Sequence, residues 1–114
     1  MQLNNGQRAL FFFQVLYGHA NHGISQFFHQ ISYLMDTVDI WSALKSGVKY
    51  FGDIEMLGLI EKMENAYYTE AKESGNTVFF EELDRLYKEM IHSTVKLVGS
   101  FIRNHPAEFI QFQD

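Results

Sequence analysis

The sequence of 114 residues has no cysteine and a single proline, and its eight glycines never cluster into a linker. Without cysteine, disulfides and thiolate chemistry are excluded, and a reducing compartment is the simplest setting. Basic residues are also scarce, because 9 lysines and arginines stand against 14 aspartates and glutamates, for a formal net charge of −5. Since nucleic-acid phosphates are bound mainly by basic surfaces, this balance disfavours direct contact with nucleic acid.

Long hydrophobic runs are missing as well. No stretch approaches the roughly 20 apolar residues that a membrane-spanning helix needs. The apolar run at residues 9–16 follows Arg8, but Gln14 interrupts it and no small-x-small cleavage site comes after it. We therefore expect a cytoplasmic protein with no membrane contact.

Aromatic residues are abundant, with 11 phenylalanines and 6 tyrosines in a chain that is 46% apolar. These rings require burial, and the length suits one core, so residues 1–114 are predicted to form a single helical domain. Nothing alternates with period two for long, which argues against strands. The sequence predicts an all-α fold, a compact bundle of about five to six helices.

The helices are predicted from apolar spacing and from glycine, proline and capping residues. The first is apolar around nearly its whole circumference, which is typical of a central helix or of a subunit interface. The expected segments are residues 6–19, residues 23–35, a third helix capped by Asp36 and Thr37 and broken at Gly52, a fourth capped by Asp53, a fifth over residues 79–103, and a short closing helix at Pro106.

Three motifs in the chain resemble those of a bacterial helical family of uncharacterised proteins that includes a DNA-mimic protein. They are the hinge Asn21 to Phe28 (NHGISQFF), the acidic run Phe80 to Tyr87 (FEELDRLY) and the closing run Phe101 to Phe109 (FIRNHPAEF). His22 and Ile24 stand where that family usually has a glycine and an aromatic residue. The motif residues are interpreted as structural, with Gln26 expected to bind the backbone of the hinge: Asn21, Gly23, Gln26, Phe27, Phe28, Pro106 and Phe109.

The resemblance implies an all-helical homodimer that acts by binding proteins, possible partners including a DNA-binding protein. An acidic surface on the fourth helix and the start of the fifth is the predicted contact. Glu81 with Arg85 and Asp84 with Lys88 have the spacing of helical ion pairs, so part of this charge is expected to be neutralised locally. The predicted partner-binding residues are Glu61, Glu64, Glu70, Glu73, Glu81, Glu82, Asp84 and Glu89.

Two other functions stay open. His19, His22 and His29 suggest a small metal-dependent hydrolase, but the hinge separates them and no nearby carboxylate orients an imidazole. The all-apolar first helix also suits a structural subunit of a larger assembly. No phosphate loop, nucleophile elbow or paired buried carboxylates are found, so the sequence predicts no enzyme, cofactor or metal.

Overall fold

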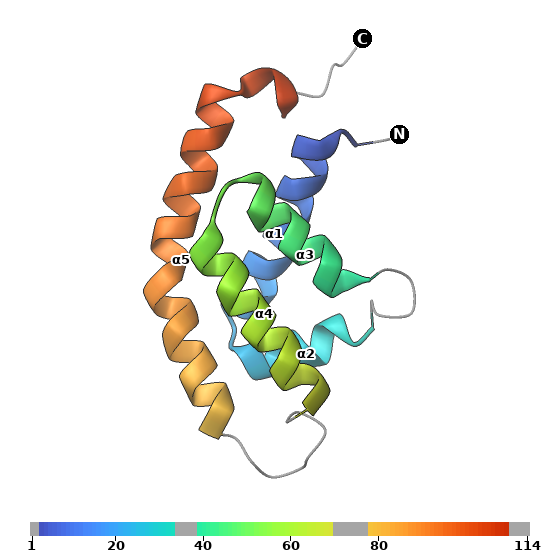
Figure 1. Cartoon of the computed structure of the whole chain (residues 1–114), viewed down its shortest axis with the longest axis vertical. Coiled ribbons are helices and arrows are strands. Elements are labelled where there is room, and N and C mark those ends of the chain that lie inside the picture. Colours follow the sequence, from blue (N-terminus) through green and yellow to red (C-terminus); the bar gives the residue numbers. More distant parts are fainter. Residues whose placement is uncertain (1–2, 34–38, 70–77, 110–114) are drawn as a thin grey trace.

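The computed structural model describes residues 3–33, 39–69 and 78–109, which form five α-helices and one 3₁₀ turn (Figure 1). No strand occurs in these three ranges, so the predicted all-α bundle is confirmed. The elements are α1 (Asn5–Ala20), α2 (Ile24–Ile31), α3 (Ile40–Tyr50), α4 (Ile54–Thr69), α5 (Val78–Asn104) and η1 (Pro106–Glu108).

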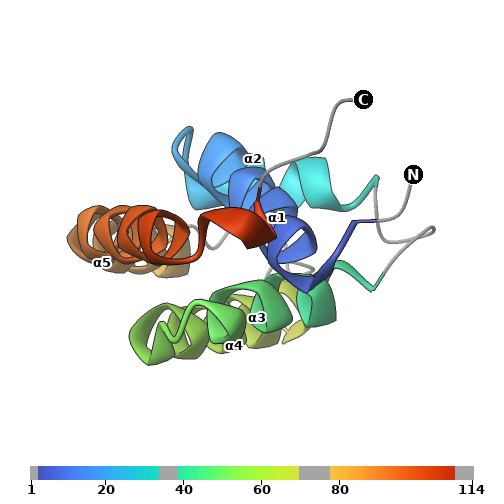
Figure 2. The same ribbon diagram turned by 90° about the horizontal axis from the view of Figure 1, so that it is seen from above.

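The helices pack in two groups with α5 alongside both. Seen from above, α1 and α2 lie on one side, α3 and α4 on the other, and α5 flanks them (Figure 2). In sequence order α1 packs on α2 and α3, α3 on α4, and α5 on both α4 and α2. No helix in the described part of the chain is long and apolar enough to cross a membrane.

The core centres on Trp41 of α3, which is fully buried. Its ring contacts those of Phe27, Phe28 and Tyr67, with centroid distances of 6.1, 6.0 and 5.6 Å. Aromatic pairs at such distances contribute about 0.5–1.5 kcal/mol each beyond their burial. The shared rings therefore join α2, α3 and α4.

Helix ends follow the glycine and aspartate signals, with one correction. Gly52 ends α3 with a φ of 83°, and the Asp53 carboxylate accepts a hydrogen bond from the Met56 amide at 3.0 Å, as predicted. The cap of α3 is Asp39, whose carboxylate accepts from the Ser42 amide at 3.2 Å. These hydrogen bonds from Ser42 lower the pKa of Asp39.

The predicted cap at residues 36–37 is therefore wrong in register, because α3 begins only at Ile40. Both residues lie outside the described ranges. The helix α2 is also shorter than predicted and ends at Ile31, since Ser32 and Tyr33 form a turn. The last residues of the predicted segment, 34 and 35, are not among those described.

The buried residues of α5 recur at helical spacing. Leu83, Tyr87, Ile91, Thr94 and Val98 are buried, whereas Leu97 is 37% exposed. The Thr94 hydroxyl donates to the carboxylate of Asp53 at 2.5 Å. This bond fixes the middle of α5 against the residue that caps the start of α4.

Candidate partner-binding surface

The hinge between α1 and α2 is held by side chains of α5. Gly23 precedes α2 with a φ of 108° and has no side chain to cap the helix. The Asp84 carboxylate supplies the missing acceptor and receives the Ile24 amide hydrogen at 2.7 Å. Three residues further along α5, the Tyr87 hydroxyl donates to the Asn21 side-chain oxygen at 2.9 Å. A carboxylate at this end of α2 also interacts favourably with the helix dipole.

Burial adds a second constraint on the same contact. Phe27 and Phe28 are buried, and the ring of Phe28 meets that of Phe80 of α5 at a centroid distance of 5.5 Å. Desolvation raises the pKa of the Tyr87 hydroxyl, which therefore stays a neutral donor. The hinge motif and the acidic motif thus form one interlocked unit.

Gln26 does not take the expected part in this unit. Its side chain is exposed and makes no hydrogen bond within the described residues, so the predicted bond to the hinge is wrong. Asn21, from the same motif, makes the polar contact instead.

The closing motif packs the end of α5 onto α3. The rings of Phe51, Phe101 and Phe109 form a cluster, with Phe51 and Phe101 at 5.3 Å. Beside them the Tyr50 hydroxyl donates to the Glu108 carboxylate, and this hydrogen bond is the main reason that the pKa of Tyr50 rises to about 12. Pro106 begins η1, the short closing turn that the sequence predicts.

The predicted acidic residues that the structure describes lie on α4 and α5 and have different neighbours. Glu81, Asp84 and Glu89 line a shallow hollow of about 500 Å³ along α5, together with two cationic side chains, Arg85 and Lys88. Glu82 lies 4.0 Å from Lys62 of α4. Glu61 is exposed on α4, while residues 70 and 73 of the predicted set lie outside the described ranges.

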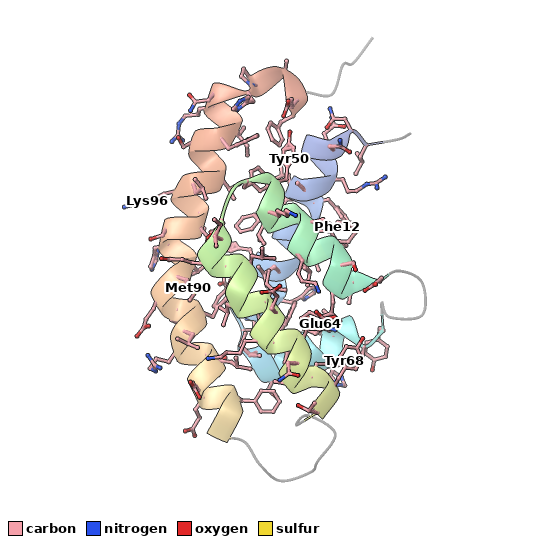
Figure 3. All side chains as sticks on the ribbon, viewed as in Figure 1. Phe12, Tyr50, Glu64, Tyr68, Met90 and Lys96 are labelled. Carbon is pink, nitrogen blue, oxygen red and sulfur yellow. The ribbon has the colours of Figure 1, made fainter. Side chains whose placement is uncertain are left out.

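Glu64 is set apart from the α5 carboxylates. It lies on α4 near Tyr68 (Figure 3) and is half-buried, with its carboxylate 2.6 Å from the Lys45 amine of α3. The hydrogen bond from this amine to Glu64 raises the pKa of Lys45. Glu64 therefore joins α3 to α4.

The predicted helical ion pairs within α5 are both wrong. Arg85 pairs with Glu89 at 3.0 Å and not with Glu81, and Asp84 is engaged by α2 and not by Lys88. Glu81, Glu82 and Glu89 remain exposed, and we define these three side chains as the α5 acidic face.

The three histidines are not gathered into a site. His19 lies at the end of α1, His22 is exposed in the hinge, and the exposed His29 ring packs against Tyr33 at 5.5 Å. In the described ranges, no three or more histidine, aspartate or glutamate side chains come together in a way that suits a metal ion.

Sequence reasoning missed the two bonds from α5 to the hinge. A signal for one of them exists, because a helix that starts after glycine lacks its own capping side chain and requires an acceptor from elsewhere. Neighbouring sequence does not reveal which acceptor, since Asp84 is 60 residues away.

The comparisons with known proteins give one family. No curated protein and no solved structure matches the chain. A family model described as DMP19-like protein matches residues 1–105, almost the whole length. The chain belongs to the DMP19-like protein family.

Proposed function

We propose that the protein acts by binding a partner protein through the α5 acidic face, with Glu61 of α4 as a further contact. The partner would present a basic surface, such as the surface with which a DNA-binding protein holds its DNA. Membership of the DMP19-like family supports this proposal, as does the net charge of −5.

The observation that carries the proposal is the placement of exposed carboxylates on a firmly held helix. Glu81 and Glu89 are eight residues apart, which corresponds to about 12 Å along an α-helix. Phosphates on one DNA strand recur about every 3.4 Å along the axis, so the length of this stretch equals the axial rise of three to four phosphates. The bonds of Asp84 and Tyr87 to the hinge keep the stretch in place.

Cations of the protein itself lower the charge of this face but do not block it. The pairs of Lys62 with Glu82 and Arg85 with Glu89 have side chains that are nearly 60% exposed. Exposed pairs of this kind contribute only about 0–1 kcal/mol. Lysines or arginines of a partner would therefore replace them at little cost.

The experiment is affinity capture from cells that encode the protein, at low and at high salt. The bait is the native chain or the variant Glu81→Lys/Glu82→Lys. We expect the double variant to lose a partner that the native chain retains at low salt, because exposed charge contacts respond to reversal and to screening.

Glu55→Lys is the matched control. It reverses one charge where the double variant reverses two, so it is compared with the single variant Glu81→Lys. Glu55 and Glu81 are both exposed and both lie in the first turn of their helix, which makes the charge change and the cost to the helix dipole of these two single variants alike. Equal capture by native chain, double variant and control would refute the acidic face as the binding surface.

We also propose that the protein is a homodimer, as the resemblance implies. Light scattering of the purified chain tests this separately, and a monodisperse monomer would contradict it.

A further inference from the structure

A second hollow lies between α1 and α3, away from the α5 acidic face. Its volume is about 660 Å³, within the range of roughly 300–1,000 Å³ that is usual for small-molecule sites. Arg8 and Phe12 form the α1 wall, and Ser46 stands on the α3 wall. Figure 3 shows Phe12 beside α3, on the side of the molecule away from α5.

The hollow exists because the residues at its floor are small. A Cβ atom on Gly47 would lie 3.2 Å from the carbonyl oxygen of Ala9, so the two helix backbones approach closely there. Both residues are buried, and Ala43 adds another short side chain next to them. The result is an apolar floor between two walls that carry longer side chains.

The charge of the hollow is opposite to that of the protein. Arg8 is the only one of its lining residues with a side chain that is charged at neutral pH, and its guanidinium has no ion pair within the described residues. The hydroxyls of Ser42 and Tyr50 are already engaged as donors, to Asp39 and Glu108 respectively. Arg8, with the exposed Asn5 and Ser46, is thus left to meet a ligand.

We propose that this hollow binds a small carboxylate with an apolar body. The carboxylate would pair with Arg8, whose forked donors match a carboxylate geometrically. The apolar body would cover Phe12 and the floor at Ala9 and Gly47. This proposal does not depend on the proposed function, because none of these residues belongs to the α5 acidic face.

The test is a titration of the ¹⁵N-labelled protein with 3-phenylpropionate, in which binding is monitored through the amide chemical shifts in nuclear magnetic resonance spectra. We expect saturable shifts confined to α1 and α3, with a Kd below about 1 mM. The neutral amide of the same compound should bind at least about tenfold more weakly. Absence of saturation up to about 10 mM would overturn the proposal.

Arg8→Gln and Ser46→Leu separate the two parts of the site. Arg8→Gln removes the charge and should weaken the carboxylate about tenfold without affecting the neutral amide. Ser46→Leu fills the hollow and should weaken both compounds. Lys49→Gln is the matched control, since Lys49 is an exposed cation of α3 outside the lining. If Arg8→Gln and Lys49→Gln lose equal affinity for 3-phenylpropionate, the attraction is non-specific and depends only on charge, and this result would also overturn the proposal.

Discussion

Replacing Asp84 by alanine removes the cap that α5 supplies to α2. Loss of a capping side chain costs about 0.5–2 kcal/mol. The amide of Ile24, a residue with no exposed surface, would also lose its partner, and an unsatisfied buried donor costs about 1–3 kcal/mol. Because these two costs describe the same bond, we expect a loss of about 2 kcal/mol in the free energy of unfolding, not their sum. For a chain of this length the midpoint of thermal unfolding would fall by roughly 8 °C.

The assay is urea unfolding followed by far-ultraviolet circular dichroism, with thermal unfolding as a second measure. Asp84→Asn retains an acceptor oxygen and loses only the charge, so it should cost about 0.3–1 kcal/mol. Glu81→Ala, an exposed neighbour without this bond, should stay within about 0.5 kcal/mol of the native chain. If Asp84→Ala is no less stable than Glu81→Ala, the hinge is not held by this carboxylate.

Three further predictions concern stability. Gly47→Ala should lower the free energy of unfolding by about 1–3 kcal/mol, because its methyl group meets a carbonyl oxygen of α1. Gly58→Ala, whose added methyl group has nothing within 4 Å, should raise the free energy of unfolding by about 0.5–1 kcal/mol. Urea unfolding checks both variants, and a change of the same sign in both would contradict the close approach of α1 and α3 at Gly47. Thr94→Val should lower the free energy of unfolding by about 1.5–3 kcal/mol, because it removes a hydrogen bond to a carboxylate. Thr69→Val, which removes a local and exposed hydrogen bond, should lower it by less than about 1 kcal/mol. Equal unfolding midpoints for the two variants would refute this. Because its pKa is raised, the hydroxyl of Tyr50 contributes fully to the free energy of unfolding below pH 10, and this contribution is lost as the pH rises through about 12. Tyr50→Phe should therefore lose less stability than the native chain between pH 10 and about 12. Parallel plots of the free energy of unfolding against pH for the two proteins would contradict this.

The order and the ends of the helices could be predicted from sequence where a local signal exists. Gly23 and Gly52 have positive φ, Asp53 caps the next helix, and Pro106 begins the closing turn. Each of these effects depends on the backbone within a few residues, so it does not require the tertiary fold. Asp39 shows the limit, because Asp36 and Thr37 offered equally good capping chemistry a few residues earlier.

The candidate surface was harder to predict because its side chains form hydrogen bonds and ion pairs with residues that are distant in sequence. Helical spacing favoured Asp84 with Lys88, but the uncapped start of α2 lies within reach and binds Asp84 instead. In the same way Glu64 pairs with Lys45 of α3, and Glu82 with Lys62 of α4. The sequence therefore shows which acidic residues share a helix, but it does not show which of them remain free to bind a partner protein.

Binding of a basic partner by the carboxylates of α5 is shown or refuted by the salt dependence of the affinity for the captured partner. We expect a Kd that rises steeply with salt for the native chain and less steeply for Glu81→Lys, with Glu55→Lys following the native chain. A Kd independent of salt, or the same dependence for all three proteins, would contradict it.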